Sequence, residues 1–375
     1  MKILLIKIGV FFLNIIYFFF KLLPIKNKIT FISRQSDAKS DDMILIEKSI
    51  IKKKKNIEMV FLCKKLDKNF KSIIKYFLHM FVQMYHLSTS KVIVLDSYCI
   101  VACVLKKKKN TTIIQMWHAL GAFKKFGCSI IDQEEGTKKN IAVAMKMHNN
   151  YDYVFTSSEY TKKFFSEALN TSIDKLVVMP LPRVDMLTDK KRINDIKAKI
   201  IEKYPCMKNK KNIVYAPTFR KGEENIEKIQ ELVNSIDYKR YNLIVKLHPL
   251  TNIKLESKNA IIDRHFSTLD MLGCADYVIT DYSAIVFEAA ILNKPIYFYC
   301  YDFSKYYKKR NFYLDYKKDM PGIIESDAKR LIDLIEKDSY DMKKIEKFTK
   351  KYIDYEIGKS SENIASFIID KGDFK

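Results

Sequence analysis

The sequence lacks the residue patterns that build metal sites and covalent catalytic centres. Its seven cysteines form no CxxC pair and show no Cys/His spacing, so we expect free thiols in a reducing compartment and no metal site. No GxSxG motif and no candidate cysteine nucleophile is present, and we expect no cofactor. No helix-turn-helix, RNA-recognition or zinc-finger signature is present, which argues against a nucleic-acid partner.

Acidic residues are scarce relative to basic ones. The chain has 67 Lys and Arg against 44 Asp and Glu, a net charge of +23, and tetralysine runs occupy 52–55 and 106–109. Such a surface suits an anionic partner, such as an anionic lipid or a polyanionic substrate. A solvated lysine-rich surface that reflects biased composition is the alternative.

The sequence also lacks a long uncharged apolar run. The N-terminal stretch Met1–Leu23 is apolar, but its uncharged part, Ile8–Phe20, covers thirteen residues, fewer than the roughly 20 that span a bilayer. No small-residue cleavage site comes after it, which argues against a removed signal peptide. We therefore predict that residues 1–25 form a membrane-associated helix, either in the interface or as a short anchor. A core helix of the first domain is the alternative.

The rest of the chain is a regular alternation of short apolar runs and amphipathic segments. The 375 residues are too many for one typical core, so two domains are expected. The alternation predicts α/β domains, each with a parallel sheet covered by helices, at 26–205 and 206–375. In two such Rossmann-like, doubly wound halves, ligands bind outside the carboxyl ends of the strands, in the cleft between the halves. Predicted strands lie at 29–32, 57–63, 92–95, 112–115, 154–156, 211–216, 243–246, 260–262, 277–279 and 295–299.

One strand end carries a hydroxyl-rich turn. The sequence TDYSA at 280–284 follows an apolar strand and precedes a helix, an arrangement that aims backbone N–H groups and hydroxyls at a phosphate. Thr280 and Ser283 are the candidate ligands, and either can cap the helix. An ordinary capped turn without a ligand is the alternative.

A second strand end carries a histidine. His118 follows the strand at 112–115, and a histidine there can act as a general base near neutral pH. Gly121 permits close backbone approach, and Lys124 can face an anion. A structural histidine is the alternative.

Two more strand ends are basic. Arg220, in the loop after the strand at 211–216, offers a guanidinium fork to phosphate. Lys246 and His248 alternate to one face of the next strand, before Pro249. Together, the four strand ends carry groups that suit the binding and displacement of phosphate.

These motifs resemble those of the CDP-glycerol glycerophosphotransferases, enzymes that prime and polymerise teichoic acids and related phosphopolyol polymers on bacterial membranes. The resemblance extends over about Phe31–Gly322, and its most specific block is 269–302. The other matching motifs are Trp117-His118 with Gly121 and the lysines after it, Pro-Thr-Phe-Arg at 217–220, Lys-Leu-His-Pro at 246–249, Phe312-Tyr313 and Pro321-Gly322.

The resemblance implies a GT-B-like architecture, with an N-terminal acceptor domain and a C-terminal nucleotide-binding domain. It implies transfer of glycerol phosphate, or a related polyol phosphate, from a CDP-polyol such as CDP-glycerol to a hydroxyl of a lipid-linked acceptor. CMP leaves, and the product is a teichoic acid or capsule-like polymer. The enzyme is then expected on an anionic membrane surface, at the cytoplasmic face of the cell membrane.

The residues take roles in this expected reaction. His118 takes the proton of the attacking hydroxyl, while His248, Arg220 and Ser283 hold the pyrophosphate as charge builds on it. The turn at Thr280 adds N–H donors, and Glu288, on the helix after the turn, is a weaker candidate for the ribose or cytidine. Two alternatives stay open: a GT-B glycosyltransferase that uses a nucleotide sugar in cell-surface polysaccharide synthesis, and a non-catalytic membrane- or polyanion-binding protein.

Overall fold

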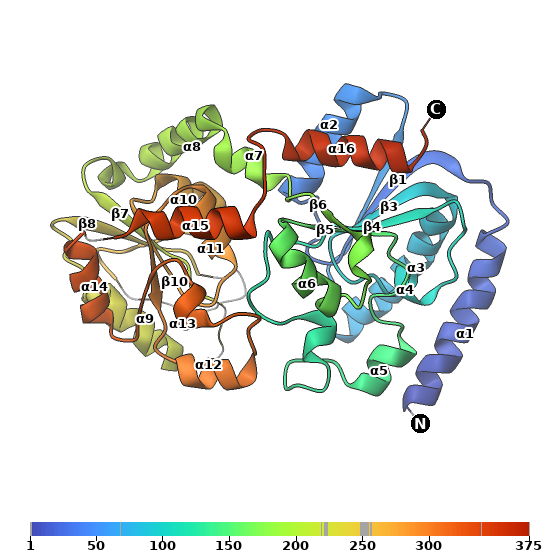
Figure 1. Ribbon diagram of the computed structural model, residues 1–375, viewed down its shortest axis with the longest axis horizontal. Helices are drawn as coiled ribbons and strands as arrows, with labels where there is room; N and C mark the ends of the chain where they lie inside the picture. Colours follow the sequence, from blue (N-terminus) through green and yellow to red (C-terminus); the bar gives the residue numbers. More distant parts are fainter. Residues whose placement is uncertain are drawn as a thin grey trace. The chain divides into compact units, whose positions relative to one another are not determined.

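The computed structural model describes residues 2–67, 69–218, 220, 224–247, 255, 257–338 and 340–374. The chain forms two compact units: the first contains residues 1–185 and 354–375, and the second contains 186–353 (Figure 1).

These limits differ from the predicted boundary after residue 205 in two respects. Helix α8 (Lys190–Lys203) belongs to the second unit, because it packs on α10 (Thr268–Cys274) and Arg192 pairs with Asp270 at 2.7 Å. The C-terminal helix α16 (Ser360–Lys371) belongs to the first unit, because it packs on α2 (Asp41–Lys53).

The first unit is built on a six-stranded parallel sheet with strand order β2-β1-β3-β4-β5-β6. Every residue of β3 except one is buried, as expected for a parallel strand between two helix layers. The strands are β1 (Lys26–Ser33), β2 (Glu58–Cys63), β3 (Ser90–Leu95), β4 (Thr112–Gln115), β5 (Tyr153–Thr156) and β6 (Leu176–Val178). The other helices are α1 (Lys2–Phe20), α3 (Phe70–Thr89), α4 (Ile100–Val104), α5 (Lys139–Ala144) and α6 (Glu159–Ala168), with 3-10 helices at Gly127–Ile130 and Ile173–Lys175. Helix α7 (Arg183–Thr188) contains the boundary between the two units.

The second unit repeats this design with strand order β12-β11-β10-β7-β8-β9, again all parallel. Its strands are β7 (Lys211–Tyr215), β8 (Tyr241–Val245), β9 (Ile261–Ile262), β10 (Tyr277–Thr280), β11 (Ile296–Tyr299) and β12 (Ile323–Glu325). Its other helices are α9 (Glu224–Asn234), α11 (Ile285–Ile291), α12 (Phe303–Lys309), α13 (Tyr316–Asp319), α14 (Ala328–Glu336) and α15 (Met342–Tyr352), with a 3-10 helix at Pro205–Lys208.

Each sheet has one point where the strand order reverses. In the first unit this switch point lies between β1 and β3, and in the second between β7 and β10. Ligands of doubly wound sheets bind at such points, outside the carboxyl ends of the strands. The predicted pair of Rossmann-like α/β units is confirmed, and the two switch points indicate where each unit holds its functional groups.

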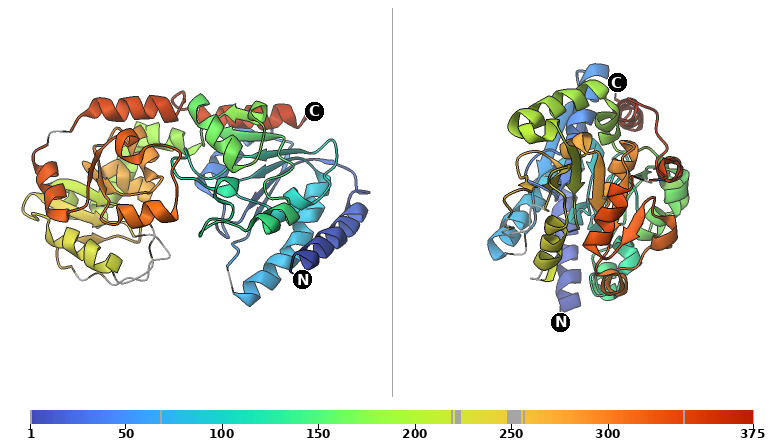
Figure 2. Two further views of the ribbon diagram at one scale, coloured as in Figure 1. Left: turned by 60° about the horizontal axis from the view of Figure 1, so that its bottom comes forward. Right: turned by 90° about the vertical axis from the view of Figure 1, so that its left-hand side faces the viewer.

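Helix α1 lies on the surface of the first unit. It packs against α3 and α5, and Figure 2 shows α1 and α3 side by side. Tyr17 alone among the described residues of α1 is buried, which contradicts the alternative of a core helix. Within the described chain, α1 is the one helix long and apolar enough to cross a membrane.

Candidate functional site

The switch point of the first unit holds polar groups from three strand ends. Arg34 follows β1, and its backbone N–H donates to Ser97 Oγ at 3.1 Å. Asp96 and Ser97 follow β3 and are buried. His118 comes from the segment after β4, and its Nδ1 lies 2.9 Å from the carbonyl oxygen of Asp96. The predicted placement of His118 near the carboxyl edge of the sheet is therefore present in the structure.

The backbone at Trp117 turns His118 toward that edge. Trp117 has a φ of 58°, a left-handed backbone conformation that residues other than glycine rarely adopt and that costs about 1 kcal/mol. Its N–H donates to Gln115 Oε1 at 2.9 Å, and its ring lies 4.4 Å from the His118 ring, centroid to centroid. Such locally strained residues cluster at functional sites, which supports a functional reading of this segment.

The contacts of His118 decide its tautomer. A carbonyl oxygen only accepts hydrogen bonds, so the 2.9 Å contact with Asp96 requires the proton on Nδ1. The Gln35 amide nitrogen is 3.4 Å from the same atom, a longer contact that carries less weight. Burial lowers the pKa of His118, which keeps the ring neutral at pH 7. The unprotonated Nε2 is therefore able to accept a proton from a substrate hydroxyl.

Asp96 is a buried carboxylate beside this histidine. Its side chain is 2% exposed, and within the described chain its Oδ1 has no hydrogen-bond partner. Burial raises the pKa of Asp96 to about 6, opposed by hydrogen bonds from Ser33 and Ser97. The site thus holds a carboxyl group that is ionised at neutral pH at a cost to stability. Sequence reasoning missed Asp96, although an aspartate directly after a strand at a switch point was a usable signal.

We expect Asp96→Asn to raise the free energy of unfolding at pH 7 by on the order of 3 kcal/mol, from the shift between 3.8 and about 6. Because the folded pKa is the higher one, the wild-type protein gains stability as the pH falls from about 6 to about 4. The advantage of the variant should disappear over that window, as measured by urea unfolding. A variant less stable than wild type at every pH would show that the carboxylate is well paired.

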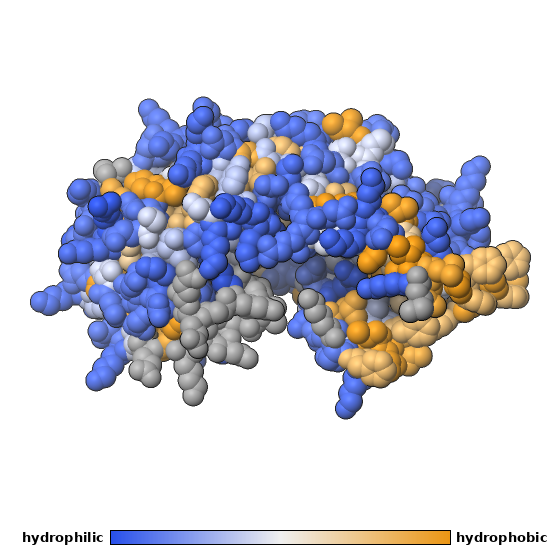
Figure 3. Space-filling view, turned by 90° about the horizontal axis from the view of Figure 1, so that it is seen from below, coloured by the Kyte–Doolittle hydropathy of each residue, from blue (hydrophilic) through white to orange (hydrophobic). Residues whose placement is uncertain are grey.

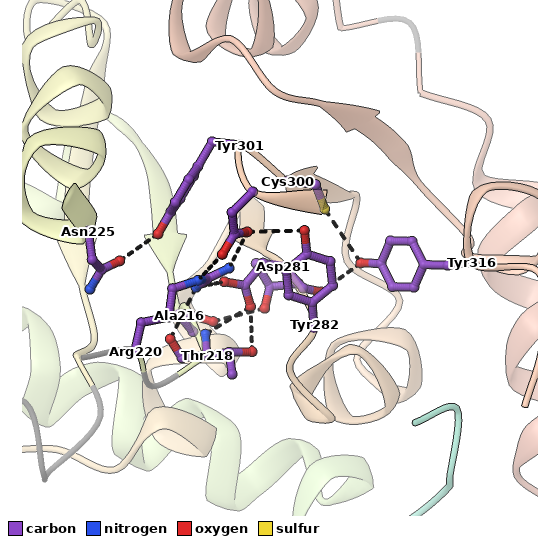
Figure 4. Close-up of polar contacts among 11 residues, drawn as sticks. Ala216, Thr218, Arg220, Asn225, Asp281, Tyr282, Cys300, Tyr301 and Tyr316 are labelled. Carbon is purple, nitrogen blue, oxygen red and sulfur yellow. Dashed lines mark hydrogen bonds and ion pairs between the residues drawn. The ribbon is translucent and has the colours of Figure 1, made fainter. Parts of the chain in front are cut away.

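The switch point of the second unit is organised around Asp281, which follows β10 and is fully buried (Figure 4). Asp281 Oδ1 accepts from the Thr218 N–H at 2.8 Å and from Thr218 Oγ1 at 2.6 Å, and Oδ2 accepts from Arg220. The Tyr316 hydroxyl donates to the Asp281 carbonyl at 2.8 Å. These bonds fasten the loop after β7 to the loop after β10.

Arg220 is held between two carboxylates. Its Nε and Nη2 donate to Asp302 at 2.8 and 3.0 Å, and its Nη1 donates to Asp281 and, at 3.2 Å, to the Thr218 carbonyl. Four of the five guanidinium N–H groups therefore have acceptors. Burial acts to lower the pKa of Arg220, but Asp281 and Asp302 raise it overall, so the cation is fixed. This arrangement differs from the predicted role of Arg220 in holding pyrophosphate and gives it a role in positioning the loop. The partners Asp281 and Asp302 were not singled out from the sequence.

The side chains of the TDYSA turn at 280–284 differ in burial and in hydrogen bonding. Thr280 is fully buried and donates to the Ala216 carbonyl at 2.8 Å, so its predicted helix cap is wrong: the N-cap of α11 is Ala284, without a side-chain cap. Ser283 is half-buried, and its Oγ lies 3.4 Å from the Ile285 N–H. Glu288 lies in the first turn of α11 and is 4% exposed. Ser283 is thus the predicted ligand best placed to meet an anion here.

Lys246 also differs from its predicted role. It is buried, and its ammonium donates to Asp263 Oδ2 at 2.6 Å, to the Asp263 carbonyl at 3.2 Å and to the Phe266 carbonyl at 2.6 Å. All three N–H groups are therefore used inside the second unit. His248 lies outside the described residues.

The two other predicted ligands lie in the first unit, after His118. Gly121 is buried, and Lys124 is half-buried with its ammonium 5.8 Å from the Phe123 ring centroid.

Comparisons with known proteins identify the family. The family model for CDP-Glycerol:Poly(glycerophosphate) glycerophosphotransferase matches residues 15–370. The chain is 34% identical to the teichoic acid ribitol-phosphate primase of Bacillus spizizenii, over 92% of each chain. It is also 34% identical to the teichoic acid glycerol-phosphate primase of Bacillus subtilis, over 96% of each chain.

Solved structures show the same fold. The wall teichoic acid polymerase TagF aligns with a TM-score of 0.75 at 23% identity, over 99% of this chain and 97% of that chain. A UDP-GlcNAc 2-epimerase from Neisseria meningitidis aligns with a TM-score of 0.60 at 14% identity, over 93% of this chain and all of that chain. With the match to the family model over most of its length, the chain belongs to the CDP-glycerol:poly(glycerophosphate) glycerophosphotransferase family.

Proposed function

We propose that the protein transfers a polyol phosphate from a CDP-polyol, such as CDP-glycerol, to a hydroxyl of a lipid-linked acceptor during teichoic acid or similar cell-wall polymer synthesis. The observation that carries this proposal is the neutral His118 with its unprotonated Nε2 at the switch point of the first unit. The family and the names of its relatives support the donor class, and two structures of TagF include CDPG.

The proposed reaction is a displacement at phosphorus. His118 Nε2 takes the proton of the acceptor hydroxyl as its oxygen bonds to the β-phosphorus of the donor. The bond from the β-phosphorus to the bridging oxygen breaks, and CMP leaves with that oxygen. Ser283 and His248 are proposed to contact the donor phosphates. Arg220 acts indirectly by holding the loop at Thr218 in place.

A donor panel tests this function. We expect CMP release from CDP-glycerol or CDP-ribitol when a hydroxyl acceptor is present, because the site supplies a base for that hydroxyl. UDP-sugars should release no UDP. Nucleotide release is measured by chromatography, with and without acceptor, and the preferred CDP-polyol identifies the polymer. Release of UDP but not CMP would instead support the nucleotide-sugar glycosyltransferase.

We further propose that α1 holds the enzyme on an anionic membrane surface, at its cytoplasmic face. Figure 3 shows apolar side chains gathered over this helix. Leu5, Ile8 and Phe12, on one face of α1, are 63%, 42% and 56% exposed. The adjacent α3 adds exposed apolar side chains, including Phe77 and Leu78. An exposed apolar surface in a lysine-rich protein fits an interfacial helix on anionic lipid.

Replacing Leu5, Ile8 and Phe12 by glutamine in one triple variant should weaken vesicle binding at least about tenfold. Each replaced side chain no longer buries its apolar surface in the membrane, and such burial contributes roughly 25 cal/mol per Å² to the free energy of binding. Turnover on a short soluble acceptor should not change. Co-sedimentation with vesicles measures the first quantity, and CMP release the second. The matched control replaces Ile51, Ile173 and Ile357, exposed apolar residues elsewhere on the first unit, and should bind like wild type. Equal vesicle binding by both triple variants would show that α1 does not contact the membrane.

A further inference from the structure

A groove of about 500 Å³ runs beside α1 and has a mixed lining. Phe11, Ile15 and Phe18 supply apolar surface, and Lys21 and Lys106 also line it. Phe11 and Phe18 are 63% and 60% exposed, so the groove opens at the protein surface, on the same helix that is proposed to contact the membrane.

The groove is held by specific contacts. The Asn14 side-chain amide donates to the Val104 carbonyl at 3.1 Å, and its oxygen accepts from the Lys106 N–H at 3.1 Å. These two bonds join the middle of α1 to the segment after α4. Tyr17, one turn further along α1, is 1% exposed. The lysine-bearing segment is thereby fixed against the apolar helix.

The lysines of the run at 106–109 have different partners. Lys107 is paired with Asp152, whereas the Lys108 ammonium donates to the Leu23 carbonyl just beyond α1. Burial lowers the pKa of Lys108, and repulsion from the Lys21 ammonium lowers it further. In the parts of the chain that the structure describes, no carboxylate lies within 4 Å of the Lys21, Lys106 or Lys108 ammonium. This concentration of positive charge beside apolar surface calls for an amphipathic anion.

We propose that the groove binds one anionic membrane phospholipid, with its hydrocarbon chain along Phe11, Ile15 and Phe18. Its phosphate lies among the ammonium groups of Lys21, Lys106 and Lys108. A soluble phosphate would use the charges alone, whereas a phospholipid uses both the charges and the apolar lining. This inference rests on the proposed membrane association of the enzyme and adds a defined lipid site to it.

The test compares two triple variants that change the net charge equally. The site variant carries Lys21→Gln, Lys106→Gln and Lys108→Gln. The control carries Lys48→Gln, Lys53→Gln and Lys55→Gln, in or just after α2 of the same unit, where all three lysines are exposed. Full-length proteins are floated with phosphatidylcholine vesicles, with and without phosphatidylglycerol.

Phosphatidylglycerol should strengthen the vesicle binding of the wild-type protein and of the control variant. The site variant should lose most of this gain, because each lysine contributes about fivefold to the affinity for anionic vesicles. An equal loss in both variants would overturn the site in favour of diffuse surface charge.

A second measurement works in solution, without a bilayer. Short-chain phosphatidylglycerol, below its micelle concentration, should bind to the wild-type protein with 1:1 saturation. The substitution Ile15→Trp fills the groove, so the lipid chain buries less apolar surface there, and lipid binding should weaken at least about tenfold. Glycerol phosphate or inorganic phosphate that binds as tightly as the lipid would show that the chain makes no contact, and would overturn the proposal.

CMP release from a CDP-polyol with a soluble acceptor is measured in parallel, and the site variant should retain it. A wild-type protein that releases CMP but does not bind the short-chain lipid overturns the lipid site alone. Lipid binding by a wild-type protein that releases no CMP overturns the proposed transferase function alone.

Discussion

Replacing His118 with alanine is expected to lower turnover about 10²-fold or more, the usual effect of losing a general base. In the proposed mechanism, the neutral ring accepts the proton on Nε2, because its Nδ1–H is bound to the Asp96 carbonyl. Alanine removes the proton acceptor while leaving the sheet intact, so thermal unfolding should change little. Steady-state CMP release measures turnover. The exposed His265, replaced in the same way, is the matched control and should retain full activity.

His118→Gln separates chemistry from positioning. The glutamine amide can still donate to the Asp96 carbonyl but cannot accept a proton, so its loss of turnover should match that of alanine. In wild type, burial lowers the pKa of His118 below its ordinary 6.5, so the base form persists on acidification. The acid limb of kcat/KM should therefore lie below pH 6.5. Near-wild-type turnover in either variant would exclude His118 as the base.

Arg220→Ala is expected to destabilise the protein by about 3–5 kcal/mol, the effect of removing one partner from a buried ion pair. The change leaves the carboxylates of Asp281 and Asp302 without their cation, and Asp281 is fully buried. Urea unfolding followed by tyrosine fluorescence measures the loss. Arg192→Ala is the control: it breaks a single, more exposed pair with Asp270 in the same unit, worth about 1 kcal/mol or less.

A compensated variant distinguishes a structural from a ligand-binding guanidinium. Arg220→Met combined with Asp281→Asn and Asp302→Asn removes the cation and both anions, so much of the lost stability should return. The KM for the donor should still be higher than in wild type, because Thr218 loses the Asp281 carboxylate that orders its loop. If Arg220→Ala instead raised donor KM without any loss of stability, the guanidinium would contact the phosphates directly, as the sequence suggested.

The strands could be predicted wherever an apolar run was long enough to stand out. All ten predicted strands are present in the structure. The two that were missed, β6 (Leu176–Val178) and β12 (Ile323–Glu325), are three-residue strands at sheet edges, too short to show a pattern. The domain limits were missed because an amphipathic helix shows that one face is buried, not which unit covers it. Helices α8 and α16 both illustrate this.

For the candidate site, the sequence was sufficient to predict which strand each described candidate residue follows. His118 comes after β4, as predicted, and contacts the Asp96 carbonyl after β3, a contact that the sequence did not indicate. The sequence showed Arg220 and Lys246 as available cations, but Arg220 pairs with two carboxylates and Lys246 with one, all later in the chain. Arg220 reaches Asp302, 82 residues away, and Lys246 reaches Asp263. A buried cation needs a counter-ion, and its identity follows only from the tertiary structure.

Because residues 354–375 return to the first unit, the second unit is an insertion within the first, and the first is completed by residues that are synthesised after the second. Asp185 accepts hydrogen bonds from the Ser360 and Ser361 N–H groups, which ties α16 to the point where the chain leaves the first unit. On the ribosome, the inserted unit is complete before the unit that surrounds it. Truncation after residue 353 would therefore damage the first unit, which contains His118, and leave all residues of the second unit in place.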